Sequence, residues 1–335
     1  MEENDIRRAL NREYAPKPDV KAEWERLGNR LDIEQESAQM VSIGRNRRMM
    51  AASFFTGIAA TLATLYVISI LTRQPDSEIR YAFTAIEQPS EVMLTTADGE
   101  THPVAKGNEI MPQKAKSGNN ALASSKMCTL TTPRGKDFQL SLADGTTVWM
   151  NADTRLDFPE AFSGKSRIVR LKGEAFFEVA KDEKHPFIVE TDYFNATVLG
   201  TSFNIRAYNE RSAAVVLVDG SVEMEAGVIR QMLKPGEMAT FNTQLSTFNC
   251  KEVDTYPYTQ WRDGFFYFND ASLFEIMQEL GRWYNINIAF DNPAKMNLHL
   301  HFVAQRSSSI REAISNLNAL GVVQIDYENG VVTIK

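Results

Sequence analysis

The stretch MMAASFFTGIAATLATLYVISILT, from Met49 to Thr72, decides how this chain is organised, because it contains no charged side chain. As a helix of about 24 residues it would be roughly 36 Å long, enough to cross the hydrocarbon core of a bilayer, which is about 30 Å thick. A secretory signal peptide would carry a shorter apolar core within roughly the first 15 to 30 residues and end at a small-residue cleavage site. The sequence therefore predicts a permanent transmembrane helix over residues 49–72.

The charges that flank this predicted helix give its direction. Arg45, Arg47 and Arg48 precede it, whereas Arg73 on the far side is soon followed by acidic residues. Positive residues near a span are retained on the cytoplasmic side of a membrane. Residues 1–48 are therefore expected in the cytoplasm, and the long C-terminal part is expected to be exported. This predicts a single-pass protein of the inner membrane.

The chain has an ordinary globular composition, because 43% of its 335 residues are hydrophobic and 24% are charged. This excludes disorder for most of the chain and leaves room for two or more folded domains outside the membrane. The net charge of −7 comes from the part beyond Arg48, and an acidic exported part is a poor binder of nucleic acid. The only cysteines are Cys128 and Cys250. The sequence is compatible with a disulfide between them and with two separately buried thiols.

Residues 1–48 are expected to contain an amphipathic helix that needs a partner. Such a helix would carry Val20, Trp24, Leu27 and Leu31 on one face. The segment is too short to bury this apolar stripe in a core of its own. A hairpin that buries its own stripes and a helix lying on the inner membrane surface are alternatives, although acidic residues nearby would be repelled by anionic lipid. We therefore expect the stripe to bind another protein.

From Cys128 to about residue 250 the sequence is typical of an all-β domain. Short alternating or β-branched runs are separated by turn signals such as Asp144-Gly145 and Pro235-Gly236. The pattern predicts a β sandwich, a jelly roll or a β-helix-like barrel. The stretch LTTADGETHPV, from Leu94 to Val104, has the same form as LSLADGTTVWM inside this region. Residues 73–127 are therefore expected to hold one further hairpin and a linker.

The sequence of the exported region contains no clear metal-binding or catalytic motif. No cluster of oxygen ligands surrounds its Asp-Gly pairs, so hairpin turns explain them better than cation loops. His299 and His301 could share one strand face, but the sequence supplies no third ligand. Asp144, Glu174 and Glu178 are carboxylates near one another, and we expect the two glutamates at solvated strand edges rather than as an acid-base pair. No metal, cofactor or enzymatic site is expected.

Residues 261–335 are predicted to form a separate α+β module. Capping boxes at Ser272 with Glu275 and at Ser309 with Glu312 begin two helices. The predicted order is β-α-β-β-α-β-β, with the last two strands joined by a turn. Such a module would bury one face of its sheet under the helices and leave a face or an edge open to another protein. A module that only adds stability is the alternative.

The motifs of the β region resemble the FecR family of membrane-spanning anti-sigma regulators, in the form widespread in Bacteroidetes. The matching stretches are LADGTTVWMNADTRLDFP from Leu142, RLKGEAFFEVAKDEKHPFIVET from Arg170, VLGTSFNIRAY from Val198, VLVDGSVE from Val216 and LKPGEMATF from Leu233. Residues 261–335 resemble the C-terminal domain of that family, whose fold is similar to the short signalling domain of secretins and TonB-dependent transducers. The resemblance covers nearly all of residues 127–335.

This resemblance implies a multidomain single-pass membrane protein. Its parts would be a cytoplasmic sigma-factor-binding segment, the transmembrane helix, a periplasmic hairpin and linker, an all-β FecR domain of jelly-roll or β-helix-like form, and an α+β signalling-interaction domain. The implied bounds of these parts are residues 1–48, 49–72, 73–127, 128–250 and 261–335.

The function implied is that of an anti-sigma factor, not of an enzyme. The chain would relay a signal from an outer-membrane TonB-dependent transducer to an extracytoplasmic-function sigma factor that controls genes for the uptake of iron or glycans. The sigma factor would bind the stripe of Val20, Trp24, Leu27 and Leu31, whereas the transducer-binding residues stay unknown. Envelope proteases would be further partners.

One local motif could carry chemistry. In some FecR-like regulators the Gly-Thr peptide of the VLGTSF motif breaks by itself, because the Thr hydroxyl attacks the preceding carbonyl. In this chain the bond would join Gly200 and Thr201. A tight connection in which Gly supplies an unusual φ and Thr begins a strand is the simpler explanation. A membrane-tethered periplasmic scaffold and an envelope enzyme remain as alternative functions of the whole chain.

Overall fold

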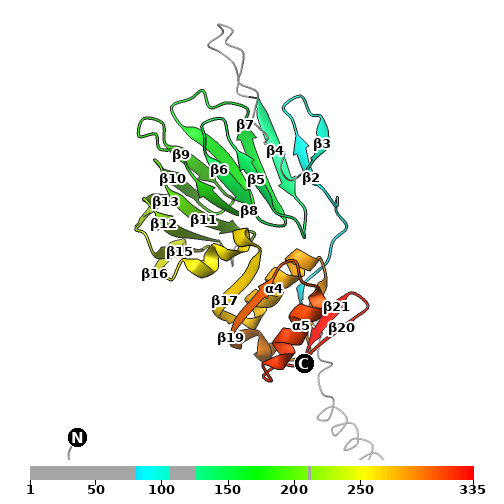
Figure 1. Ribbon diagram of the computed structural model, residues 1–335. Helices are drawn as coiled ribbons and strands as arrows, with labels where there is room; N and C mark the ends of the chain where they lie inside the picture. Colours follow the sequence, from blue (N-terminus) through cyan, green and yellow to red (C-terminus); the bar gives the residue numbers. More distant parts are fainter. Residues whose placement is uncertain (1–79, 106–125, 210–212) are drawn as a thin grey trace, which may run out of the picture. The chain divides into compact units, whose positions relative to one another are not determined.

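The computed structural model describes residues 80–105, 126–209 and 213–335. They belong to one compact unit, Pro75–Lys335, which contains a β domain and a C-terminal module (Figure 1). The predicted span over residues 49–72 lies outside the described residues, as does the segment over residues 1–48. Within the described ranges, no helix has both the length and the apolar character needed to cross a membrane.

The β domain consists of two sheets that share one long strand, β8 (Arg167–Glu178). The first half of β8 pairs with β7 (Thr154–Pro159) and β9 (Phe187–Glu190), and its second half pairs with β6 (Thr147–Met150) and β11 (Ser202–Ala207). Gly173 lies where β8 passes from one sheet to the other, with a φ of 119°. A Cβ there would stand 2.4 Å from Thr154 Oγ1, so only glycine fits.

The remaining strands extend both sheets from this shared strand. The first sheet continues from β9 through β10 (Asn195–Val198) and β13 (Val222–Ala226) to β14 (Ile229–Leu233), and from β7 through β4 (Met127–Thr132) to β2 (Val92–Thr95) and β3 (Thr101–Val104). The second continues from β11 through β12 (Ala214–Asp219) and β15 (Glu237–Asn242) to β16 (Thr247–Glu252), and from β6 to β5 (Phe138–Ser141). The predicted upstream hairpin is thus confirmed as β2 and β3.

One apolar core lies between the two sheets. Alternate residues of the strands point into it, as Leu130 and Leu156 do from the first sheet and Val148 and Phe203 do from the second. Burial of one face of each strand is what the period-two pattern requires. The β-rich prediction is confirmed, and the arrangement corresponds to a sandwich.

The C-terminal module has the predicted order β-α-β-β-α-β-β. It comprises β17 (Phe265–Ser272), α4 (Leu273–Tyr284), β18 (Asn287–Phe290), β19 (His299–Gln305), α5 (Ile310–Ala319), β20 (Ile325–Glu328) and β21 (Val331–Ile334). Short 3-10 turns lie before β17 and between β18 and β19: η3 (Tyr256–Tyr258), η4 (Gln260–Asp263) and η5 (Pro293–Asn297). In both predicted capping boxes the serine hydroxyl, of Ser272 or Ser309, accepts from the glutamate N–H three residues on.

The expectation of one sheet with a face under two helices is wrong. The strands form two sheets, β17 with β19 and β1-β18-β21-β20, and α4 packs against strands of both (Figure 1). The reason is that α4 is apolar on more than one side: Leu273, Ile276, Met277 and Leu280 are fully buried, and Phe274, Trp283 and Tyr284 also pack on the core.

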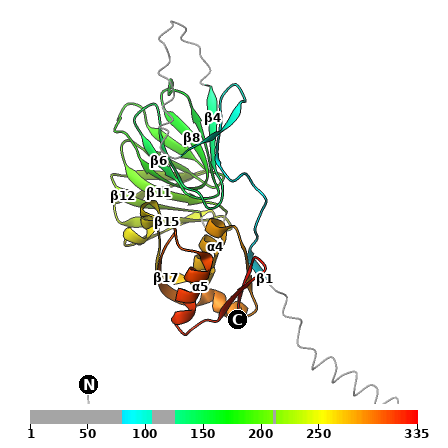
Figure 2. The ribbon, with the colours of Figure 1, turned by 45° about the vertical axis from the view of Figure 1, so that its right-hand side comes forward.

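A strand that precedes the β domain belongs to the C-terminal module. β1 (Arg80–Phe83) pairs antiparallel with β18, with Arg80 opposite Phe290 and Phe83 opposite Ile288 (Figure 2). The sequence predicts a hairpin and a linker for residues 73–127, and no local pattern in it indicates this pairing. The consequence is that the chain enters the module before it enters the β domain.

Candidate functional site

The β domain presents buried polar side chains to the C-terminal module on the outer face of its second sheet. Asn151 follows β6, Glu174 lies on β8 and Asn204 lies on β11, and their exposed fractions are 0%, 6% and 2%. The amide of Asn151 donates to Glu174 Oε2 at 2.8 Å, and that of Asn204 donates to Glu174 Oε1 at 3.0 Å. The buried carboxylate therefore has a hydrogen-bond donor for each oxygen, as a buried charge requires.

A second carboxylate, Glu279, enters this cluster from α4. Its Oε2 accepts from Arg206 at 2.8 Å and from Arg282 at 2.7 Å, and its Oε1 accepts from Arg306 at 3.1 Å. Arg206 belongs to β11, so this bond joins the two modules directly. Arg306 also crosses the interface, because its Nη1 donates to Asn151 Oδ1 at 2.8 Å.

The ionisation of Glu279 is set by two opposing effects. Burial disfavours the charged carboxylate, but the guanidinium charges of Arg282, Arg206 and Arg306 outweigh burial and lower the pKa of Glu279 to about 2. Glu279 is therefore ionised at any physiological pH. Three arginines face two glutamates in this cluster, which leaves it with one excess positive charge.

Aromatic rings cover the arginines of the interface. Arg282 lies over Tyr208 at 3.6 Å from the ring centroid, Arg306 lies over Trp283 at 4.4 Å, and Arg262 lies over Phe176 at 3.6 Å. Burial raises the pKa of Tyr208, so its hydroxyl stays protonated and donates to the Ala152 carbonyl at 2.6 Å. A guanidinium group that lies over an aromatic ring is attracted by the negative face of the ring, and this attraction is stronger where water is excluded.

This cluster sets how the two modules dock. A buried ion pair contributes little net stability, because the cost of removing its charges from water offsets their attraction. Removing one partner, however, leaves an uncompensated buried charge. The bonds from Arg206 to Glu279 and from Arg306 to Asn151 form only in one docked arrangement, so the cluster makes that arrangement specific.

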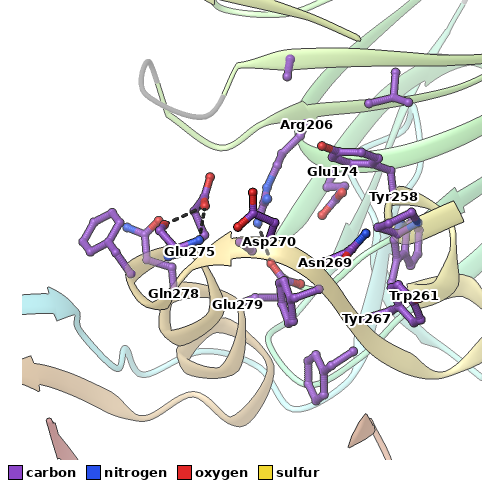
Figure 3. A pocket seen from close by; sticks show the side chains of 18 of the residues that line it. Glu174, Arg206, Tyr258, Trp261, Tyr267, Asn269, Asp270, Glu275, Gln278 and Glu279 are labelled. Atoms are coloured by element: carbon purple, nitrogen blue, oxygen red, sulfur yellow. Dashed lines mark hydrogen bonds and ion pairs between the residues drawn. The ribbon is translucent and has the colours of Figure 1, made fainter. Parts of the chain in front are cut away.

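Beside the cluster, the two modules enclose a groove of about 920 Å³ (Figure 3). One wall is a face of β12 and β15, and the other is the whole of β17 with the first half of α4. Tyr258 and Trp261 also line it, as do Glu174, Arg206, Glu279 and Arg306 of the cluster. Because both modules line the groove, it exists only in the docked arrangement.

The structure corrects one prediction about the carboxylates. Glu174 is not at a solvated strand edge, because its side chain is buried and accepts from the amides of Asn151 and Asn204. Glu178 has a side chain that is 51% exposed and faces Arg262 at 3.6 Å, as expected for a strand edge. Asp144 accepts from Arg167 Nη1 at 2.8 Å and so has a structural partner. The three carboxylates therefore have separate partners.

Gly200 and Thr201 connect β10 to β11. Gly200 has a φ of 156°, and a Cβ there would lie 2.8 Å from the Cα of Lys181. The Thr201 hydroxyl is buried and donates to the Ser221 carbonyl at 2.9 Å. The contacts agree with a tight connection that requires glycine, which is the explanation expected in place of self-cleavage at this bond.

Other predicted residues lie apart from the interface. Cys128 is buried and Cys250 is exposed, and both are free thiols, so the structure contains two separate thiols. His299 and His301 are exposed on β19, and no group of three metal-ligating side chains occurs in the part of the chain that the structure describes. The proposed sigma-binding residues Val20, Trp24, Leu27 and Leu31 lie outside the described residues.

Sequence reasoning missed the interface cluster. In the sequence, the positions of Glu279 and Arg282 are typical of the polar side of an amphipathic helix. The position of Arg206 is typical of an exposed strand residue. Only the docking of the C-terminal module on the β domain brings Arg206 to Glu279. Arginines are common on the polar side of strands, and acidic residues are common on the polar side of helices. Their presence therefore does not predict a contact between distant segments.

Comparison with known proteins gives two family matches and a structural relative. Residues 128–223 match the family FecR protein, and residues 265–334 match the family FecR, C-terminal. The chain is similar to a proposed anti-sigma factor from Parabacteroides distasonis ATCC 8503, known from two crystal structures. Each has 29% sequence identity and a TM-score of 0.57, over 62% of this chain and 98% of the solved chain. No curated protein matches this chain.

Proposed function

We propose that this chain, which belongs to the FecR family, is an anti-sigma factor that binds a sigma factor and controls its availability. The observation that carries the proposal is the match of both family domains in their order along the chain. The similarity to a proposed anti-sigma factor along 98% of that protein's solved chain supports it.

The finer proposal is a relay across the inner membrane. Residues 1–48 would hold an extracytoplasmic-function sigma factor in the cytoplasm, residues 49–72 would span the membrane, and residues 73–335 would lie in the periplasm. There they would receive an outer-membrane TonB-dependent transducer that has bound its nutrient. The uncharged stretch from Met49 to Thr72 and the arginines before it support this topology.

The position of β1 gives the relay a physical route. β1 begins at Arg80, only a few residues beyond the proposed span, and it is a strand of the C-terminal module. A force or a rearrangement in that module would therefore reach the membrane helix without passing through the β domain. A straight apolar helix transmits little unless it is moved, clustered or cut, and in the proposed relay a displacement of β1 would move it, because the two are close along the chain.

The sigma-binding stripe can be tested by a double substitution. We expect Trp24→Glu with Leu27→Glu to abolish co-purification of the sigma factor from detergent-solubilised membranes of the host, with a loss of at least tenfold, because two charges would enter an apolar contact. The matched control is Ala22→Glu with Asn29→Glu, which adds the same charge on the opposite helical face and should retain the sigma factor. Undiminished co-purification of the Trp24 and Leu27 variant would contradict the assigned face.

A further inference from the structure

One edge of strand β17 has no partner in the described part of the chain. β17 pairs on one side with β19, from Phe265 opposite Gln305 to Ser272 opposite His299. On the other side, none of its N–H or carbonyl groups between Phe265 and Ala271 bonds to another described backbone segment. An edge of this kind can accept another strand.

This unpaired edge faces the groove between the two modules. Every residue of β17 from Phe265 to Ser272 lines the groove, including Phe266, whose side chain is 1% exposed and belongs to the core. A strand that showed only one face would contribute alternate residues, because side chains alternate between faces. The groove is therefore bounded by the main chain of β17 (Figure 3).

The opposite wall suits the side chains of an added strand. Ala214 and Val216 on β12 lie opposite Thr240 and Met238 on β15, and all four line the groove from one sheet face. Ala214 and Thr240 are small and half-buried, whereas Val216 and Met238 are only 2% and 8% exposed. Small side chains on this wall leave room for a strand whose main chain pairs with the edge of β17, as in strand-addition recognition.

The charges of the groove exclude a polyanionic ligand. Three basic side chains line it, Arg206, Lys251 and Arg306, together with four carboxylates, Glu174, Asp270, Glu275 and Glu279. A site for nucleic acid or an anionic lipid surface would carry an excess of positive charge. A groove without such an excess fits a polypeptide instead.

We propose that this groove receives an extended strand of a second protein, which pairs with the edge of β17 over Phe265–Phe268 and becomes the third strand of the β17–β19 sheet. The proposal rests on the proposed function, in which that protein is the signalling domain of the transducer. Pairing stops at Asn269 and Asp270, because the register shifts there and Asp270 has a φ of 55°. The paired length is then about 13 Å.

The edge at β20 is less suited to this role. β20 carries Asp326 and Glu328, and its residues do not line the groove. Charged side chains on an edge strand oppose pairing with another chain. The edge of β17, in contrast, faces a groove that both modules line. Binding of a partner there would therefore depend on whether the two modules are docked.

Amide exchange on the full chain in detergent micelles tests the docking edge. The probes are the isolated signalling domains of the TonB-dependent transducers of the host, added one at a time. We expect one domain to bind and to slow amide exchange of residues 265–268 at least tenfold. Thr240→Arg, which places a bulky charge in the groove, should weaken that binding at least tenfold. Asn242→Arg is the matched control, because it lies two residues further on the same strand and outside the groove; it should bind as the unmodified chain does.

The outcomes separate this surface from the relay. A transducer domain could bind both variants equally strongly without slowing amide exchange in residues 265–268. That result would overturn the docking edge but would still support the relay. If no transducer domain binds, the relay is wrong, and the docking edge proposed from it is withdrawn. Protection that rises with the concentration of the chain alone would identify a second copy as the occupant and would also overturn the proposal.

Discussion

At the scale of single residues, Glu279 decides how the two modules meet. It lies on α4 and bonds to Arg206 of the β domain as well as to Arg282 and Arg306 of its own module. Without this carboxylate, the buried guanidinium groups of Arg282 and Arg306 and the half-buried one of Arg206 would face only Glu174. Such unbalanced buried charge is costly. We therefore expect the loss of Glu279 to weaken the docking of the two modules more than the loss of other interface residues.

We expect Glu279→Gln to lower the free energy of unfolding by about 3 kcal/mol at pH 7, because it leaves a buried positive charge uncompensated. Urea denaturation measures this. Glu275→Gln is the matched control, since Glu275 lies one turn earlier on α4 and its role in the helix cap can be filled by glutamine; it should cost less than about 0.5 kcal/mol. Equal losses in both variants would contradict the role of Glu279.

The same interaction gives a pH dependence with a defined sign. The pKa of Glu279 falls from its ordinary 4.5 to about 2 in the folded chain. The stability that its ionisation contributes is therefore complete above pH 4.5 and is lost as the pH falls toward 2. The difference in unfolding free energy between the unmodified chain and Glu279→Gln should shrink over that interval. A difference that stays constant from pH 5 to pH 2.5 would show that Glu279 is not held ionised by the arginines.

The Gly200–Thr201 bond is expected to stay intact. The Thr201 hydroxyl donates to the Ser221 carbonyl, and attack on the Gly200 carbonyl would require that bond to be broken first. On a denaturing gel the chain from host membranes should migrate as one fragment, and Thr201→Ala should look the same. Two fragments in the unmodified chain that merge into one in Thr201→Ala would establish self-cleavage instead.

At the scale of elements, β1 links the start of the exported part to the C-terminal module. Phe83 packs on the module's core, and Gly281 of α4 makes room for its ring, because a Cβ at Gly281 would lie 2.7 Å from Phe83 Cδ1. After β1, the Ala85 N–H donates to Asn287 Oδ1 at 2.8 Å, and Asn285 Nδ2 donates to the Ile86 carbonyl at 2.8 Å. These contacts keep the segment on the module beyond the end of the strand.

Phe83→Ala should loosen β1 from β18. We expect a loss of about 2 kcal/mol in the free energy of unfolding, less than for a fully buried phenylalanine, and faster amide exchange in residues 287–290. Thr84→Ala is the control, because Thr84 is exposed and its carbonyl, which accepts from Arg134, is retained. Unchanged exchange in the Phe83 variant would mean that β1 is not needed to hold the sheet together.

At the scale of the whole molecule, the proposed function depends on topology. A phosphatase that folds only after export should be active when fused after residue 335 and inactive when fused after residue 48, because the arginines at 45, 47 and 48 retain that end in the cytoplasm. Added protease should then digest the C-terminal part in spheroplasts and spare residues 1–48. Equal activity of the two fusions would place both ends in one compartment, where no relay could operate.

Local patterns in the sequence determined the elements and their order. The helix starts at Ser272 and Ser309 are decided by hydroxyl groups that bond to backbone three residues away. The turn between β20 and β21 is decided by Asn329 and Gly330, both of which have a positive φ. Such contacts lie within a few residues, so composition and spacing were sufficient to predict the order β-α-β-β-α-β-β and the alternating strands of the β domain.

Only the tertiary structure decided which surfaces meet. The pairing of β1 with β18 joins segments about 200 residues apart, and the bond between Arg206 and Glu279 joins residues of two modules. The groove beside β17 likewise requires two modules to dock. A residue type and its spacing report on its own strand or helix, whereas contacts between elements depend on shape and charge that no single stretch contains.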